Sequence, residues 1–489
     1  MANQNNNVNL IFGLKIRTLR QRKGINYQQM SQLTGMALSY LHDIENGKKY
    51  PKTDKILTLA KVLEVDYDYL VSLSGDKKLQ PIIDLLNSNF LSAIPWEHFG
   101  LTSNTLLEVF TNTPDRVTAF MSTILRISRT YQMSKGNFYT LALRSYQDLF
   151  DNYFEELENL STKIIEENRN LSEDTIEISV LEQILQKEYQ IEVNRKKMAT
   201  ISELQNLRSF FNKEQKILYL NNNLSNAQEK FLITREIVFQ RLALSPRPYQ
   251  TVLVDLKSFE HLLNNFKASY GACAILMPED KLVDDIRKNL FNQQKWHQNN
   301  WIEMLKKYDV TPEMFLQRLT NILPKHFGLN QLFFLRIEGD VTKNQYEITK
   351  ELHLGQLHDP YANVGTEHYC RRWLSINSIK ESLKSNTNDY IIDLQISEYW
   401  QTHNRYLCIS IAKSNKRKNT ATSVTIGIMI DAKTSRVINF LNDKEIPIKV
   451  VHTTCERCGV EKCEQRAKEP TILQEEEEIA LVKKSLKQL

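Results

Sequence analysis

The sequence predicts a multidomain α+β protein, and three observations lead to this fold class. The chain has 489 residues, and since about 100 to 200 residues fill one domain, roughly three domains are expected. Apolar residues recur at helical spacing over residues 11–73 and again over residues 80–200. Apolar and polar residues alternate over residues 328–360 and 405–450, which is typical of an antiparallel sheet.

These patterns divide the chain into four regions. We expect an all-helical helix-turn-helix bundle, a helical linker or dimerisation region, a mostly helical third region, and a C-terminal domain in which helices flank an antiparallel sheet and cysteines hold a metal centre. The expected boundaries are 1–75, 80–176, 177–325 and 326–489.

The composition is that of a soluble globular protein, with 41% hydrophobic and 25% charged residues. We find no segment apolar enough to span a bilayer, and the first ten residues, MANQNNNVNL, lack the basic start and apolar stretch of a secretory signal. A cytoplasmic location with no membrane partner is therefore expected. Six cysteines are too few for a disulfide scaffold in so long a chain.

The N-terminal region favours a DNA-binding fold. We expect five helices, and the second and third are separated by a short turn at Gly35, as in proteins that insert a recognition helix into the major groove. Residues 11–61 hold ten Lys and Arg against three Asp and Glu, a surplus of seven positive charges that suits a polyanion. The expected helices are Gly13–Lys23, Tyr27–Thr34, Leu38–Asn46, Thr53–Leu63 and Tyr67–Leu73.

The stretch QQMSQLTGMALSYLHDIENGKKYP resembles the helix-turn-helix of phage-repressor-like regulators of the xenobiotic-response-element type. The resemblance implies binding to double-stranded DNA, with base edges and phosphates contacted by Gln28, Ala37, Ser39, Tyr40, His42, Lys48 and Lys49. In the family the first of these lies at a helix end, the next four face the bases, and the two lysines meet phosphates. A small helical bundle with a solvated basic face is the alternative. Because two-fold regulators need a fixed half-site spacing, we expect residues 80–176 to support a homodimer.

The third region resembles the IrrE-like peptidase domain around Ile178–Val193 and Leu207–Leu244. Those peptidases carry His-Glu-x-x-His, which places two zinc ligands on one face of a helix beside a glutamate that activates water. Here the segment is Arg235-Glu236-Ile237-Val238-Phe239, so both ligands are replaced and the motif is degenerate. We expect no enzyme activity, and we expect Glu236 to pair with a neighbouring cation on a helix.

A cysteine cluster lies near the C-terminus, in the segment TTCERCGVEKCEQRAKEP. Cys455, Cys458 and Cys463 have the spacing Cys-x2-Cys-x4-Cys, and Gly459 gives the turn freedom to bring the third thiolate to a shared metal. The best candidate for a fourth ligand is Cys370. Cys273 and Cys408, which stand in apolar runs, are expected in the core. Cysteines without a metal, in a surface loop, are the alternative.

Five segments together resemble the short-chain fatty-acyl transcriptional regulators over roughly the whole chain. They are ASYGACAILMP, YDVTPEMFLQRLTNI, FFLRIEGDVTKNQYE, HYCRRW and CERCGVEKCEQRA. The resemblance implies that the C-terminal domain is a sensor that binds an acyl-CoA, and that a [4Fe-4S] cluster is held by Cys370, Cys455, Cys458 and Cys463. Four thiolates suit tetrahedral zinc equally well, and His452 or His368 could then serve as a ligand.

The effector site itself is not identified by the sequence. A CoA-type ligand needs cations for its phosphates, and those nearby in sequence are Arg371, Arg372, Lys413, Lys416, Arg417 and Lys418. A solvated loop between two strands is the alternative for the last four. These observations together favour a DNA-binding transcriptional regulator that responds to a short-chain acyl-CoA or to the state of an iron-sulfur cluster. A zinc-stabilised DNA-binding regulator or scaffold without an effector is the alternative.

Overall fold

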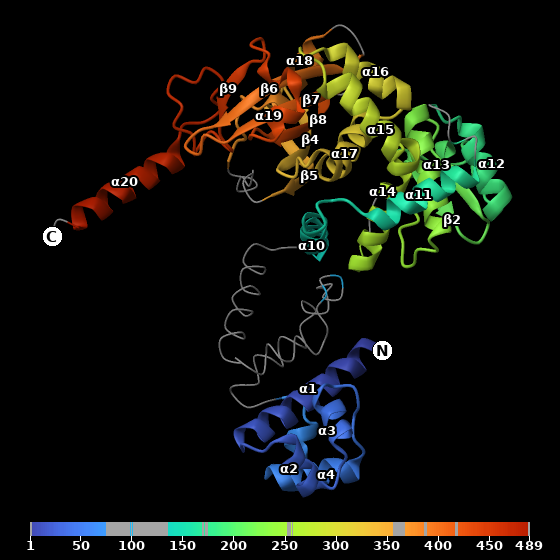
Figure 1. The fold of residues 1–489 in the computed structure, drawn as a ribbon, viewed down its shortest axis with the longest axis vertical. Coiled ribbons are helices and arrows are strands. Elements are labelled where there is room, and N and C mark those ends of the chain that lie inside the picture. The colour runs from blue at the N-terminus through green and yellow to red at the C-terminus, as the bar shows by residue number, and fades with distance from the viewer. Residues whose placement is uncertain are drawn as a thin grey trace. The chain divides into compact units, whose positions relative to one another are not determined.

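The computed structural model describes residues 2–74, 98, 100, 135–168, 171, 175–251, 256, 258–355, 367–385, 389–415 and 419–487, with backbone alone for 2–7 and 135. The chain divides into two compact units (Figure 1). One comprises residues 1–146 with 256–259, and the other comprises 147–255 with 260–489. The amphipathic segment predicted at residues 120–133 lies outside the described residues. The boundaries near residues 75, 176 and 325 stay predictions.

The N-terminal unit contains the predicted bundle of five helices. They are α1 (Ala2–Arg22), α2 (Tyr27–Thr34), α3 (Leu38–Glu45), α4 (Thr53–Leu63) and α5 (Tyr67–Val71). Their buried faces meet in one core that includes Phe12, Ile16, Met30, Leu41 and Leu59. Amphipathic helices this short are stabilised mainly by such packing, because isolated helices of this length are marginal in water.

Two of these helices differ from the prediction by more than one residue at an end. The first begins at Ala2 instead of Gly13, and Ile11, which precedes the predicted start, is buried on it with 1% of its surface exposed. The fifth ends at Val71 instead of Leu73. The ammonium of Lys15 lies 2.6 Å from the carbonyl oxygens of both Tyr69 and Ser72, and these contacts satisfy the end of the helix with a side chain.

The second unit begins with helices that precede a small sheet. The prediction of a mostly helical third region was incomplete, since strands β1 (Glu192–Asn194), β2 (Ser209–Asn212) and β3 (Ile217–Leu220) form a three-stranded sheet in the order β1-β3-β2. Strands of three or four residues are too short to produce a clear alternation. The helices of this part, of which α10 crosses the boundary between the units, are α10 (Lys135–Leu149), α11 (Glu155–Glu167), α12 (Ile178–Tyr189), η3 (Met198–Thr200), η4 (Ser202–Leu204), α13 (Asn226–Arg241), α14 (Phe259–Leu276), α15 (Glu279–Asp285), η5 (Ile286–Phe291), α16 (Gln298–Tyr308), α17 (Pro312–Ile322) and η6 (Leu323–Phe327).

A six-stranded sheet forms the C-terminal part, as Figure 1 shows in orange and red, in the order β5-β4-β8-β7-β6-β9. All neighbouring strands are antiparallel except β6 and β9, which are parallel. The prediction identified the antiparallel sheet but missed β6. The strands are β4 (Leu332–Asp340), β5 (Gln345–Leu354), β6 (Ile391–Tyr399), β7 (Arg405–Asn415), β8 (Thr420–Met429) and β9 (Ile448–Val451), with helices α18 (Leu374–Lys384), α19 (Thr434–Val437), η7 (Asn439–Asn442) and α20 (Thr471–Leu486).

Helices cover both faces of this sheet. Along β4, Phe334 belongs to a core shared with Phe315 of α17, whereas Phe333 belongs to a second core shared with Ile379 of α18. Successive side chains of a strand point to opposite faces, so each face has its own apolar layer. Among the described helices, none is long and apolar enough to cross a membrane.

Candidate functional site

The recognition helix α3 is placed by two glycine-containing turns. Helix α2 begins with a reciprocal capping box between Asn26 and Gln29 and ends at Gly35, whose φ is 66°. After a three-residue turn, α3 follows, and Gly47 beyond its end has a φ of 68°. A left-handed residue ends a helix at low cost when it is glycine, so local sequence alone dictates this helix-turn-helix, as predicted.

Most of the side chains predicted to read DNA are exposed. Six of the seven are exposed and Tyr40 is half-buried; the exposed ones are Gln28, Ala37, Ser39, His42, Lys48 and Lys49. The aromatic ring of Tyr40 packs partly against the bundle core. This exposure is what base and phosphate contacts require, although the individual DNA contacts stay predictions.

The two lysines after the recognition helix differ in their surroundings. The Lys49 ammonium lies 3.0 Å from a carboxylate oxygen of Asp43 and 5.8 Å from the centre of the Tyr40 ring. The backbone N–H of Lys48 donates to the carbonyl of Asp43 at 2.9 Å. A phosphate that binds Lys49 must therefore compete with the ion pair between Lys49 and Asp43. This ion pair is exposed, and exposed ion pairs contribute little to stability.

A buried polar network supports the end of α3. The guanidinium of Arg20 donates to both carboxylate oxygens of Glu45, at 2.6 and 2.8 Å, and the Tyr27 hydroxyl donates to Glu45 at 2.7 Å. Burial and the bond to Glu45 raise the pKa of Tyr27 to about 12. Because bidentate Arg–carboxylate pairs fix orientation, helices α1, α2 and α3 are held together behind the DNA-reading surface.

The four predicted cysteine ligands come from two segments that the fold brings side by side. The N–H of Cys370 donates to the carbonyl of Thr453 at 3.1 Å, and the N–H of Cys455 donates to the carbonyl of His368 at 2.9 Å. Burial, with a further contribution from Cys455 and Cys458, raises the pKa of the Cys370 thiol to about 11. Burial also raises the pKa of Cys458, to which Cys455 and Cys463 contribute. The backbone bonds therefore hold the segment of Cys370 beside the segment of Cys455 across a long sequence separation.

The chain around the cysteines is folded tightly by side chains that bind its backbone. Arg466 donates to the carbonyls of Cys455, Cys458 and Val460, at 3.2, 3.1 and 2.6 Å. The N–H of Ala467 donates to the sulfur of Cys455 at 3.4 Å. Across the described residues, no group of three or more His, Cys, Asp and Glu side chains has the arrangement that would hold a metal ion.

The two candidate histidine ligands have other partners. The Nδ1 of His368 lies 2.7 Å from a carboxylate oxygen of Glu456, and the Nδ1 of His452 lies 3.1 Å from the hydroxyl of Thr453. Gly459 has a different role from the predicted one: its φ is not positive, whereas a Cβ there would lie 2.2 Å from the Trp400 ring. The glycine is required by close packing, because no side chain fits under the indole.

The region of the degenerate zinc motif is occupied by a buried ion pair. Glu236 accepts two bonds from Arg247, at 2.9 and 2.8 Å, and one from Gln240 at 2.6 Å. The guanidinium of Arg247 also stacks 4.2 Å from the centre of the Phe239 ring. The predicted pairing of Glu236 with a neighbouring cation is confirmed, although Arg247 lies beyond the end of α13 and not on a helix. Burial raises the pKa of Glu236, and Arg247 acts in the opposite direction.

A cleft of about 930 Å³ is lined by the six-stranded sheet, by helices α13, α14 and α17, and by loops next to the small sheet. The lining residues include five cations, Arg208, Arg235, Arg336, Lys350 and Lys413, and the carboxylate Glu313. Ser225 and Thr311, the N-cap residues of α13 and α17, also line it. Helix N-termini attract anions, so two of them add to the positive charge of the side chains.

The charges in the cleft act on one another. Burial acts to raise the pKa of Glu313, but Lys350, Arg336 and Arg208 hold it below its ordinary value. Burial, together with the cations Arg247 and Arg208, lowers the pKa of Arg235 to about 10. An excess of like charge remains in the cleft, and a bound anion would relieve it.

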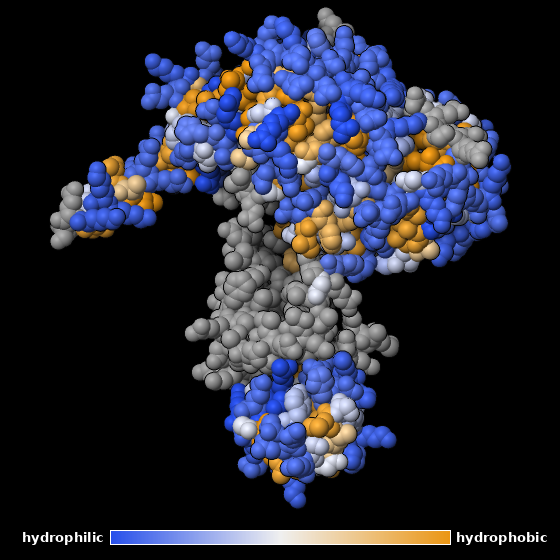
Figure 2. Space-filling view, in the orientation of Figure 1, coloured by the Kyte–Doolittle hydropathy of each residue, from blue (hydrophilic) through white to orange (hydrophobic). Residues whose placement is uncertain are grey.

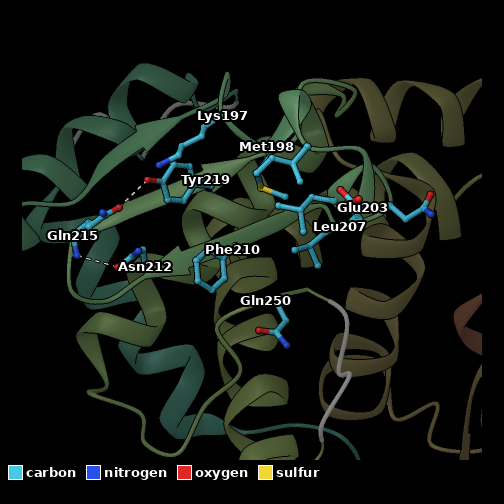
Figure 3. A pocket seen from close by; sticks show the side chains of 12 residues that line it. Lys197, Met198, Glu203, Leu207, Phe210, Asn212, Gln215, Tyr219 and Gln250 are labelled. Carbon is cyan, nitrogen blue, oxygen red and sulfur yellow. Dashed lines mark hydrogen bonds between the residues drawn. The ribbon is translucent and has the colours of Figure 1, made fainter.

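A second cavity of about 640 Å³ shares Asn206 with the cationic cleft. Figure 3 shows Met198, Leu207 and Phe210 on its wall, with Gln215 linked to Tyr219 by a hydrogen bond of 3.0 Å. The cavity therefore offers an apolar surface with polar groups at its edge, which is the usual character of a small-molecule site.

Sequence reasoning missed most of the cleft. Of the six cations proposed for an effector, Lys413 lines the cleft, whereas Lys416, Arg417 and Lys418 lie outside the described residues. Arg371 is buried and donates to Asn344 and to the carbonyl of Tyr369. One signal in the sequence could have indicated the cleft. Arg235 stands where the peptidases have a histidine ligand, and a cation at that position favours binding of an anion instead of a metal ion.

Comparisons with known proteins match the N-terminal fold. The family model "Helix-turn-helix" matches residues 16–70. The uncharacterized HTH-type transcriptional regulator YobD of Bacillus subtilis is 30% identical over 95 residues, which are 19% of this chain and 83% of YobD. The uncharacterized HTH-type transcriptional regulator RghRB of the same organism is 35% identical over 65 residues, 13% of this chain and 47% of RghRB. A solved Mycobacterium tuberculosis transcriptional regulator has a TM-score of 0.47 and 14% identity, covering 66% of this chain and 92% of that one.

The bundle, its exposed helix α3 and the matches to the family model and to the two Bacillus subtilis regulators define a DNA-binding protein of the phage-repressor-like helix-turn-helix class. The chain belongs to the HTH-type transcriptional regulators. Its helix-turn-helix binds double-stranded DNA, and the matched residues are a minor part of its length.

Proposed function

We propose that the protein is a homodimeric regulator whose DNA affinity responds to an anionic metabolite bound in the cationic cleft, and that a short-chain acyl-CoA is this effector. The observation that carries the proposal is the set of five cations and two helix N-termini around one cleft. A CoA ester has several phosphate charges, and arginine forks with helix N-termini are well suited to bind them.

The neighbouring cavity supports the choice of an acyl ester. Its wall includes Met198, Leu207 and Phe210, and it meets the cationic cleft at Asn206. A ligand with an anionic head and a short apolar chain would use both spaces. For such a ligand to change DNA binding, it must bind the DNA-competent and the incompetent conformation with different affinity.

We further propose that Cys370, Cys455, Cys458 and Cys463 hold a [4Fe-4S] cluster, with zinc as the alternative. Support comes from the backbone bonds that hold the segment of Cys370 beside that of Cys455 and from the N–H of Ala467 that donates to the Cys455 sulfur. An iron-sulfur cluster would supply a redox- and oxygen-sensitive signal, whereas zinc would supply structural stability.

We also propose that the protein is not a zinc peptidase. The glutamate that would activate water is engaged by Arg247 and Gln240, and Arg235 and Phe239 stand at the two ligand positions. A guanidinium at a ligand position cannot bind a metal.

Calorimetric titration with propionyl-CoA tests the effector proposal. We expect Arg235→Gln and Lys350→Gln each to raise the Kd for the ester at least tenfold, and we expect Lys343→Gln, an exposed lysine outside the cleft lining, to leave it unchanged. In a parallel anisotropy assay on selected operator DNA, the ester should change the affinity of the wild type and not of Arg235→Gln. Equal binding by all three variants, or no binding by the wild type, would contradict the proposal.

The visible spectrum, metal content and acid-labile sulfide of anaerobically purified protein test the cysteine centre. Iron near four per chain with matching sulfide, lost in Cys455→Ser/Cys458→Ser, supports the cluster. One zinc per chain in colourless protein supports the alternative, and neither metal in the wild type contradicts both.

A further inference from the structure

The C-terminal helix α20 (Thr471–Leu486) carries an apolar stripe with little packed against it. Ile479, Val482 and Leu486 are 54%, 59% and 62% exposed. They are three and four residues apart, and half-buried Ile472 lies seven residues before Ile479. Residues at this spacing share one face of a helix. Figure 1 shows α20 extending away from the six-stranded sheet, and Figure 2 shows hydrophobic atoms at its surface.

The charges of α20 are separated along its length. Four glutamates occupy positions 475–478, and Lys483, Lys484 and Lys487 follow in the last turns. The first half of the helix is therefore strongly acidic and the second half is basic. A partner with the reverse order of charges would match it, and the same helix turned end to end has this order.

The base of α20 is fixed to the cysteine segment. The N–H groups of Ile472 and Leu473 both donate to the carbonyl of Glu456, each at 3.1 Å. Leu473 is 8% exposed, and Arg457 lies 3.8 Å from Glu476. Because its first turn is anchored in this way, the rest of the helix projects its stripe in a defined direction.

We propose that α20 pairs in antiparallel orientation with α20 of a second copy of this chain. In a parallel pair, the four glutamates of one helix would face those of the other, and like charges at such distances repel. In the antiparallel pair, the acidic half of each helix faces the basic half of its partner, and Ile479 lies near the two-fold axis. The stripe is then buried in a short two-helix seam of the kind formed by heptad positions.

This inference deepens the proposed homodimer, since it names the surface that forms it. The helix has 16 residues and is about 24 Å long at 1.5 Å per residue. The seam spans about two heptads, so its strength should respond measurably to single positions on the stripe.

Sedimentation equilibrium of the full-length protein, in the absence of DNA, tests the seam itself. The wild type should be dimeric, and Ile479→Ser/Val482→Ser should raise the dimer Kd at least tenfold. Leu481→Ser is the matched control: Leu481 is 64% exposed on the same helix but points about 200° away from Ile479, at 100° per residue. A monomeric wild type, or an equal effect of the control variant, would overturn the proposal.

Charge exchange tests the identity of the partner. Glu475→Lys/Glu478→Lys and Lys483→Glu/Lys484→Glu should each weaken self-association, because residues 471–487 then hold five Lys against two Glu in the first variant and six Glu against one Lys in the second. An equimolar mixture of the two should regain dimers, since opposite helices then face each other. A mixture that associates no better than either variant alone would show that α20 does not pair with a second copy.

Titration of the same preparations with propionyl-CoA separates this inference from the proposed effector. None of the residues substituted on α20 lines the cleft. Loss of pairing with unchanged ligand binding would confirm that the two are independent. Intact pairing in a protein that binds no acyl-CoA would contradict the proposed effector and leave the seam supported.

Discussion

Glu236 and Arg247 form a buried ion pair in which one guanidinium nitrogen lies 2.9 and 2.8 Å from the two carboxylate oxygens. Each side chain has 5% of its surface exposed. Glu236 occupies the position of the catalytic glutamate in a zinc peptidase. The effect of its substitution on the free energy of unfolding therefore distinguishes a structural role from a catalytic one.

We expect Glu236→Ala to lower the free energy of unfolding by about 3 to 5 kcal/mol, because it leaves a buried guanidinium without its partner. Replacing both members, as Glu236→Met/Arg247→Met, should cost less than either single alanine substitution, since no uncompensated charge remains. Urea unfolding followed by the fluorescence of Trp301, which is buried in this unit, gives these values.

Peptide hydrolysis by the wild type would contradict a purely structural role for Glu236 and Arg247. If Glu236→Ala abolished a metal-dependent hydrolytic activity without affecting unfolding, the glutamate would be catalytic. Arg247→Ala serves as the matched variant, because a structural pair predicts a similar loss of stability from either side.

Gly13 of α1 is the second position where a small change has a specific expected result. A Cβ there would lie 2.4 Å from the carbonyl oxygen of Ile44 and 2.7 Å from that of Glu45. Glycine to alanine in a helix interior normally stabilises by up to about 1 kcal/mol, but here α3 must move away. We expect Gly13→Ala to lower the melting temperature and to weaken specific DNA binding.

Gln21→Ala is the control for this substitution, since Gln21 is exposed on the same helix and alanine is the better helix former. It should leave DNA binding unchanged. Anisotropy titration on specific DNA compares the two, and equal binding by Gly13→Ala and wild type would contradict the close approach of α1 and α3.

The sequence predicted these helices well where the determining signals are local. Gly35 and Gly47 end their helices through their own backbone conformation, and the capping box of Asn26 and Gln29 is visible in the sequence. The sequence could not reveal that Lys15 is buried, because its partners Tyr69 and Ser72 lie far along the chain.

The C-terminal part shows the same division between local and distant causes. Strand β6 was missed although Ile392, Leu394 and Ile396 alternate with polar residues. The polar positions between them include Gln395 and Ser397, which are buried, so the structure covers both faces of a strand whose sequence has only one apolar face. The grouping of Cys370 with the other three cysteines stays a prediction, and the cleft could not be predicted because it gathers cations from segments as distant as Arg208 and Lys413. Gly459 was predicted to provide backbone freedom, but it is required because the Trp400 ring packs against it. Trp400 is far away in the sequence, so local sequence does not predict this contact.

The buried Lys15 gives the N-terminal bundle a defined pH dependence. Burial lowers the pKa of its ammonium from 10.5 to about 8. Between about pH 8 and pH 10.5 the unfolded chain therefore binds a proton that the folded chain has released, and stability from this group rises with pH. Each unit of difference in pKa corresponds to about 1.4 kcal/mol.

Lys15→Met provides the reference without this titration. It should lower stability at neutral pH through the loss of hydrogen bonds to Tyr69 and Ser72, and the difference from wild type should widen as the pH rises from 8 to 10. Calorimetric melting of the full chain, following the transition that the substitution displaces, measures it. A difference that stays constant over this range would contradict the lowered pKa.

The two lysines beyond α3 should differ in their contribution to DNA affinity. We expect Lys48→Ala to weaken specific and non-specific binding alike and to reduce the slope of log affinity against log salt by about 1, because one phosphate contact is lost. Lys49→Ala should have a smaller effect, since Lys49 must leave Asp43 before it meets a phosphate. It follows that Asp43→Asn should strengthen binding.

Tyr40→Phe, which keeps the ring that packs on the core, should weaken specific binding more than non-specific binding, because only a base contact needs the hydroxyl. Anisotropy at several salt concentrations on specific and random duplexes measures all four. Equal losses on both duplexes for Tyr40→Phe would remove Tyr40 from the base-reading surface, and an unchanged salt slope for Lys48→Ala would remove Lys48 from the phosphate contacts.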